Sequence, residues 1–144
     1  MWIFLDFDGV LRRAGSPPMT FDRECLAAFE NAFWSLPRSE IVISSSWREV
    51  ESLAEMRERF SPDIAARVAG SVPFVAEPDE FPRHREVLEF LQRAGVGGEP
   101  WIGVDDDPLA YPKTCPVVLT DPAVGFDAAA SRKLIDLSKA AGSG

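Results

Sequence analysis

The chain opens on a short apolar segment, Trp2–Leu5, that runs directly into two carboxylates and a glycine, Asp6-Phe7-Asp8-Gly9. A continuous apolar run of this length is typical of a strand buried on both faces of a parallel sheet. Two carboxylates at its carboxyl end need a cation or a proton, because a buried charge without a partner is costly. Open α/β sheets bind their ligands at that end of the strands. The segment therefore predicts a metal or phosphate site, although Asp-Gly alone also occurs in solvated turns.

Two later segments repeat this pattern of an apolar run followed by polar side chains. Ile41–Ile43 leads into Ser44-Ser45-Ser46, and Trp101–Val104 leads into Asp105-Asp106-Asp107. One serine can cap a following helix, and another can direct its hydroxyl at an anion beside the helix N-terminus. Three adjacent acids can form a solvated turn, but the apolar run immediately before them favours a site.

The rest of the chain predicts the helices and strands that complete an α/β domain. Apolar residues recur at helical spacing over residues 20–37, 47–60, 64–68, 83–93 and 127–140, the first of these with Thr20 as its N-cap. Further strands are expected at residues 72–75 and 116–121. These elements predict a three-layer Rossmann-like fold with a central parallel sheet of about five strands. We expect one domain over residues 1–140 and a frayed tail at 141–144.

Charge and composition narrow the classes of partner. Fifteen basic and twenty-three acidic side chains give a net charge of −8, which argues against broad electrostatic binding of nucleic acid or of an anionic membrane. A small local basic patch stays compatible with this balance. We expect no membrane-spanning segment and no signal peptide, and therefore a cytoplasmic protein. Cys25 and Cys115 form no dense cysteine framework and are expected to be reduced.

Taken in chain order, these features resemble the haloacid dehalogenase-like (HAD) phosphohydrolase superfamily. Asp6-Phe-Asp-Gly-Val-Leu11 resembles its first motif, and an apolar strand ending in serine resembles its second. Arg83 at a helix start is similar to the third motif, and Val104-Asp-Asp-Asp-Pro108 to the fourth. The resemblance spans nearly the whole chain. Ile43-Ser-Ser-Ser-Trp-Arg48 is similar to small capless HAD domains, related to domains that are fused in bacterial nucleic-acid repair proteins.

This resemblance implies a Mg²⁺-dependent phosphomonoester hydrolase. Asp6 would be the nucleophile that forms an aspartyl-phosphate, and Asp8 would act as general acid and then as general base. The ligands of Mg²⁺ would be the Asp6 carboxylate, the Asp8 backbone carbonyl and Asp106. Asp105 would either bind the waters of the metal or share its ligation.

The resemblance also implies groups that bind the phosphoryl oxygens. Ser44 or Ser45 would donate from one side. The family usually has a lysine opposite; here Arg83 is the best match and Arg85 the alternative, each with the bulkier guanidinium. His84 has no part in this scheme and is expected to be exposed. Arg12 and its neighbour Arg13 are expected to form a solvated face.

The expected substrate follows from the absence of a cap, because neither gap that could hold one has room for a folded lid. An open site suits a phosphate on a large substrate, either a nucleic-acid end or a phosphoprotein. Two alternatives are a phosphatase of small metabolites and a catalytically silent phosphate- or metal-binding regulatory module. A phosphate-receiver domain ranks lowest. In such domains the phosphorylated aspartate follows a central strand and the acid pair follows the first strand, whereas this chain has Asp6-Phe-Asp-Gly9 after its first strand and an acid cluster late.

Overall fold

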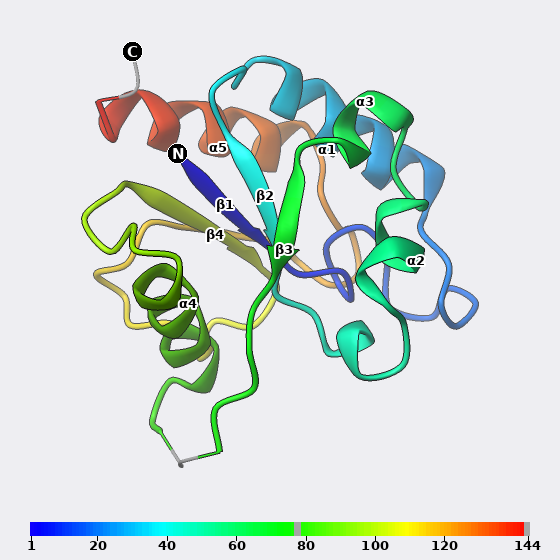
Figure 1. Ribbon diagram of the computed structural model, residues 1–144. Coiled ribbons are helices and arrows are strands. Elements are labelled where there is room, and N and C mark those ends of the chain that lie inside the picture. Colours follow the sequence, from blue (N-terminus) through cyan, green and yellow to red (C-terminus); the bar gives the residue numbers. More distant parts are fainter. Residues whose placement is uncertain (77–78, 143–144) are drawn as a thin grey trace.

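The computed structural model describes residues 1–76 and 79–142 as a three-layer α/β fold (Figure 1). Its central sheet has five strands in the spatial order β3-β2-β1-β4-β5, all paired in parallel. The strands are β1 (Trp2–Leu5), β2 (Glu40–Ile43), β3 (Val68–Ser71), β4 (Trp101–Asp105) and β5 (Val117–Leu119). The predicted fold class is confirmed. The predicted tail at 141–144 lies partly outside the described residues.

Helices cover both faces of the sheet (Figure 1). One face packs against α1 (Arg23–Trp34), α2 (Leu53–Arg57), α3 (Pro62–Ala65) and α5 (Ala128–Ala140). The opposite face packs against α4 (Pro82–Arg93). A short 3₁₀ helix, η1 (Ser46–Glu49), follows β2 directly. No cap domain is inserted in the described part of the chain.

The central strand β1 is buried on both faces, which explains why its sequence is continuously apolar. Ile3 and Leu5 join the larger hydrophobic cluster beneath α1 and α5. Phe4 points to the other face and makes edge contacts with the rings of Phe90 and Trp101, at 5.7 and 5.9 Å between ring centroids. Successive side chains thus alternate between two cores.

The register of the sheet aligns three strand ends. Leu5 of β1 pairs with the last apolar residue of β2 and with its counterpart in β4. The residues that follow, Ser44, Asp6 and Asp105, are therefore neighbours along the carboxyl edge of the sheet. The backbone N–H of Ser44 donates to the carbonyl of Leu5 at 2.9 Å, which extends the pairing by one step. This edge is where the polar residues of the sequence converge.

The predicted continuous helix over residues 47–60 is wrong. η1 ends at Glu49, and α2 begins afresh after its N-cap Ser52. The Ser52 hydroxyl accepts from the backbone N–H of Glu55 at 3.1 Å, and the Glu55 carboxylate accepts from the backbone N–H of Ser52 at 3.0 Å. This capping box starts a new helix and interrupts the old one.

Two other predicted elements also differ. The N-cap of α1 is Asp22, not Thr20, whose hydroxyl instead donates to the Pro17 carbonyl at 2.7 Å. The strand predicted at 72–75 lies earlier, at β3, and overlaps the end of the short helix predicted at 64–68. The last hydrogen bond of this pairing runs from the Val72 N–H to the Ile43 carbonyl, and Pro73 follows directly on this edge strand.

Candidate functional site

Three carboxylates gather at the carboxyl edge of β1 and β4. Asp6, Asp105 and Asp106 each offer one oxygen, and these oxygens lie within 4.8 Å of one another. Asp6 is 8% exposed and Asp105 is 2% exposed. Backbone N–H groups fix both side chains: that of Phe7 donates to Asp6 Oδ1 at 2.8 Å, and that of Asp107 donates to Asp105 Oδ1 at 3.0 Å. An oxygen-only cluster of this kind fits a hard divalent cation such as Mg²⁺.

Burial makes this cluster electrostatically unfavourable without a counter-ion. Desolvation, with repulsion from Asp105, raises the pKa of Asp6 well above its usual range. Desolvation also raises the pKa of Asp105 to about 6. The positive charge of Arg83 lowers both values in part. The carboxylates of the cluster are therefore protonated at low pH. Near neutral pH a bound cation would stabilise them.

These pKa shifts predict that the cluster destabilises the metal-free protein as the pH rises. Asp105 has a folded pKa near 6 against 3.8 for an ordinary aspartate. The free-energy cost of its buried charge is therefore absent below pH 3.8 and complete above pH 6. With a chelator present, we expect the free energy of unfolding of Asp105→Asn, measured against wild type by urea titration, to increase between about pH 4 and pH 7. A difference that stays constant or shrinks over this range would contradict the assignment.

Gly9 lets the loop after β1 pass close to the cluster. Its φ of +76° is in the left-handed region, and a Cβ placed there would lie 2.2 Å from Asp106 Oδ2. The Thr120 hydroxyl donates to the Gly9 carbonyl at 2.8 Å and anchors the loop from beyond β5. A glycine is required here by both the backbone conformation and the space that Asp106 occupies.

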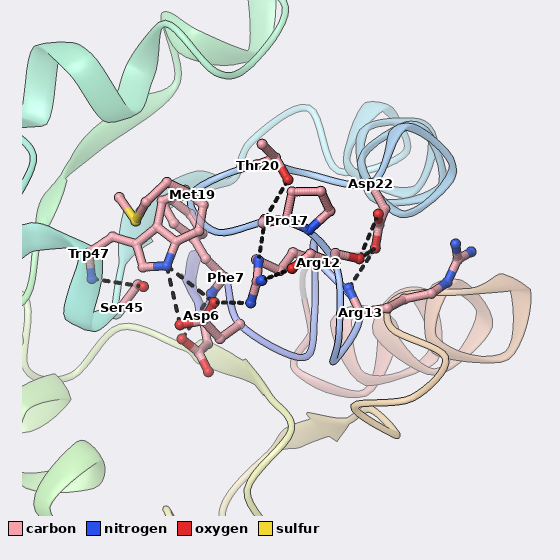
Figure 2. Close-up of polar contacts among 12 residues, drawn as sticks. Asp6, Phe7, Arg12, Arg13, Pro17, Met19, Thr20, Asp22, Ser45 and Trp47 are labelled. Atoms are coloured by element: carbon pink, nitrogen blue, oxygen red, sulfur yellow. Dashed lines mark hydrogen bonds and ion pairs between the residues drawn. The ribbon is translucent and has the colours of Figure 1, made fainter.

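Asp8 lies on the same loop, with its side chain 48% exposed. Its carboxylate accepts the indole N–H of Trp47, which lies 3.2 Å from each carboxylate oxygen. Arg12 Nη1 also donates to Asp8 Oδ1 at 3.2 Å. Figure 2 labels the two donor residues, Arg12 and Trp47. The expectation that Arg12 belongs to a solvated face is wrong, because it pairs with Asp8 and also bonds the carbonyls of Ser16 and Pro17.

A pocket of about 500 Å³ opens over these residues. Its charged lining consists of seven carboxylates and two guanidinium groups: Asp6, Asp8, Glu49, Glu86, Asp105, Asp106, Asp107, Arg48 and Arg83. Two exposed apolar side chains also line it, Phe74 at 57% and Leu109 at 74% exposure. The excess of acids means that an anionic ligand binds here only with added positive charge.

Arg83, at the first turn of α4, is one of the two arginines that line this pocket. Its Nη1 lies 2.9 Å from Glu86 Oε1, while Arg48 Nη2 lies 2.5 Å from Glu86 Oε2. Arg85, the alternative in the sequence, is exposed and does not line the pocket. The i, i+3 spacing of Arg83 and Glu86 could have predicted their ion pair. The ion pair between Arg48 and Glu86 could not be predicted from local spacing, because the two residues are 38 positions apart in the sequence.

The two serines predicted to bind phosphate have different surroundings. Both are fully buried. The Ser45 hydroxyl accepts from the backbone N–H of Trp47 at 3.2 Å and so caps η1. The Ser44 hydroxyl makes no hydrogen bond of normal geometry to the described residues, and its backbone lies beside that of Asp6. Neither Ser44 nor Ser45 lines the pocket, whereas Ser46 does.

His84 is packed into the structure, so the expectation of an exposed histidine is wrong. Its ring stacks on that of Trp101, with 5.9 Å between centroids and 30° between planes. Its Nε2 lies 3.6 Å from the sulfur of Cys115. Burial lowers the pKa of His84, and these contacts place it in the packing of α4 against the sheet.

Comparison with known proteins gives one clear similarity. A family model described as "HAD domain in Swiss Army Knife RNA repair proteins" matches residues 2–130. No curated protein matches the chain, and no solved structure matches it. None of the helices in the described residues combines the length and apolar character that crossing a membrane requires.

Proposed function

Because the chain belongs to the family of HAD domains in Swiss Army Knife RNA repair proteins, we propose that it is a Mg²⁺-dependent phosphomonoester hydrolase. The observation that carries this proposal is the buried cluster of Asp6, Asp105 and Asp106, with Asp8 on the rim of the same pocket. The cluster supplies oxygen ligands, a carboxylate nucleophile and an adjacent carboxylate for proton transfer. These are the groups that a phosphatase working through an aspartyl-phosphate needs.

The residues that would hold the metal are Asp6 and Asp106, together with the Asp8 backbone carbonyl and with Asp105 sharing the ligation. When bound, Mg²⁺ would neutralise the carboxylates and the charge of the phosphoryl group. Positive charge from the protein alone is insufficient, because both arginines of the pocket are already paired with Glu86.

The chain's own side chains account for the two proposed displacements. The Asp6 carboxylate attacks phosphorus and forms an aspartyl-phosphate, while the bond from phosphorus to the leaving oxygen breaks. Asp8 donates its proton to that oxygen and becomes a carboxylate. A water molecule then gives a proton to Asp8 and attacks phosphorus, which releases inorganic phosphate and restores Asp6. Arg83, which lines the pocket, would stabilise the charge on the transferred group.

The assignment of Arg83 predicts a sharp difference between two neighbouring arginines. We expect Arg83→Gln to lower kcat/KM for an aryl phosphate by about 100-fold, since it removes a positioned donor to the transferred group. Arg85→Gln, on the exposed side of α4, should stay within about twofold of wild type. Steady-state kinetics of both variants measure this, with circular dichroism to verify folding. Equal losses in the two variants would refute the assignment.

For the substrate class, we propose an RNA end that carries a phosphomonoester. The family description names RNA repair proteins, and the described chain has no cap that would limit access. At the pocket edge, Phe74 presents an exposed ring with the Arg48 guanidinium 4.0 Å from its centroid. A terminal base could stack on such a ring. The net charge of −8 favours binding through these few local contacts over a broad basic surface.

This substrate proposal predicts that Phe74 affects an oligonucleotide selectively. We expect Phe74→Ala to raise KM for a phosphate-ended oligoribonucleotide by about tenfold, the loss of one stacking contact, and to leave hydrolysis of nitrophenyl phosphate unchanged. Trp34→Ala, another exposed aromatic but on α1, serves as the matched control. Faster hydrolysis of a phosphopeptide than of the oligonucleotide would instead support a phosphoprotein substrate.

The proposed activity itself is tested with nitrophenyl phosphate in Mg²⁺ and in excess chelator. We expect hydrolysis that chelation abolishes and that added Mg²⁺ restores. Calorimetric titration of Mg²⁺ into the chelated protein provides a second readout. Mg²⁺ binding without hydrolysis of any phosphomonoester would point to the silent regulatory module, and absence of both would refute the site.

A further inference from the structure

Asp8 accepts a hydrogen bond from a buried indole N–H. The Trp47 indole nitrogen lies 3.2 Å from both oxygens of the Asp8 carboxylate. We propose that Trp47 is a positioning residue, whose indole N–H holds Asp8 in the orientation that delivers a proton to the leaving oxygen. This inference rests on the proposed function and assigns a residue to its proton-transfer step.

The indole is itself rigidly fixed. Trp47 is 3% exposed, and its ring lies 5.1 Å from that of Phe7 and 5.3 Å from that of Phe21. The Arg59 guanidinium lies 4.7 Å from the Trp47 ring centroid. The Ser45 cap fixes the backbone of η1 at the same residue. An immobile ring gives its N–H one direction, and that direction is toward Asp8.

The Asp8 side chain needs such a support because it is half-exposed. An unrestrained carboxylate in that setting would sample several rotamers and spend little time near the leaving oxygen. The indole N–H can only donate, so it contacts the carboxylate oxygens directly and restricts rotation of the group. Arg12 Nη1 also donates to Oδ1 of the same carboxylate. Displacement of a catalytic group by about 1 Å can cost about 100-fold in rate.

Packing alone does not explain this contact. The ring of Trp47 fills a core position, which a phenylalanine could also occupy with a smaller volume. The N–H, which a phenylalanine would lack, is directed at Asp8. Trp2, at the opposite end of β1, also donates its indole N–H to a carboxylate, Glu99 Oε1 at 3.3 Å, and it lies far from the pocket in the sheet register. Trp2 therefore offers a matched control for loss of an indole-to-carboxylate hydrogen bond.

The test compares Trp47→Phe and Trp2→Phe on a series of aryl phosphates of graded leaving-group basicity, with Mg²⁺ present. A positioned general acid matters most when the leaving oxygen is basic. We expect Trp47→Phe to lower kcat/KM for phenyl phosphate about tenfold more than for nitrophenyl phosphate. Trp2→Phe should leave both values unchanged. If Trp47 had a purely structural role, Trp47→Phe would lower kcat/KM for both substrates equally.

An Asp8→Asn background separates positioning from packing. The amide that Asp8→Asn introduces cannot act as a general acid. In that background, Trp47→Phe should therefore leave the dependence of kcat/KM on leaving-group basicity unchanged. A further steepening, or equal losses on all substrates in the single variant, would overturn the inference. Should Trp47→Phe fail to fold, Arg12→Gln removes the second donor to Asp8 and should reproduce the selective loss. If wild type hydrolyses none of the aryl phosphates, the proposed function fails and this inference fails with it.

Discussion

Asp6→Asn is expected to abolish phosphomonoester hydrolysis and, in the metal-free protein, to increase stability. The loss of activity should exceed about 10⁴-fold, because the amide removes the nucleophile of the first displacement. The gain in stability follows from the raised pKa of Asp6, which reports that its carboxylate is unfavourable in this buried site beside Asp105. We expect an increase of about 1–2 kcal/mol in the free energy of unfolding near neutral pH with a chelator present.

Asp121→Asn provides the control for this prediction. Asp121 also follows the carboxyl end of a strand, but it is exposed, and its Oδ1 accepts from the backbone N–H of Ala123 at 2.9 Å. Its replacement should change neither activity nor stability appreciably. Kinetics with nitrophenyl phosphate and urea unfolding measure the two effects. An Asp6→Asn protein that stays active, or that is less stable than wild type without metal, would contradict the role of the cluster.

Gly9→Ala should disable the site by steric contact. The added methyl would lie 2.2 Å from Asp106 Oδ2, so either Asp106 or the loop after β1 must move. The left-handed backbone adds roughly 1–2 kcal/mol of strain for a residue with a Cβ. We expect loss of Mg²⁺ binding by calorimetry, a fall in kcat/KM of at least about 100-fold and a lower melting temperature.

Gly15→Ala is the control that separates the backbone strain of a positive φ from the steric contact with Asp106. Gly15 also has a positive φ, of +91°, but a Cβ there meets no atom within 4 Å. This variant should show the strain alone, as a lower melting temperature with Mg²⁺ binding and kcat/KM retained. If both variants lost Mg²⁺ binding to the same extent, the close approach of the loop to Asp106 would not be what shapes the site.

Local sequence was sufficient to predict the edge of the sheet on which the site lies. Apolar runs that end in polar residues predicted β1, β2 and β4 and brought Asp6, Ser44 and Asp105 to one edge. The prediction succeeds because two general rules are enough for it. Side chains alternate between the faces of a strand, and parallel α/β sheets bind ligands at the carboxyl ends of their strands.

The supports of the site were not predictable in the same way. Trp47 reaches Asp8 across 39 residues of sequence, and Arg48 reaches Glu86 across 38. Such contacts depend on how η1 and α4 pack against the sheet, which no spacing in the sequence encodes. The break between η1 and α2 was missed for a different reason: the apolar stripe continued through it, and the capping box of Ser52 overrode that stripe.

The most direct measurement of the central proposal is capture of the covalent intermediate. Wild type would be mixed with nitrophenyl phosphate and Mg²⁺, quenched in acid, digested and analysed by mass spectrometry, with Asp6→Asn treated in parallel. The proposed function predicts a base-labile phosphoryl group on Asp6 in the N-terminal peptide of wild type and none in the variant. Turnover without this adduct under single-turnover conditions, or with the phosphoryl group on another residue, would contradict the mechanism.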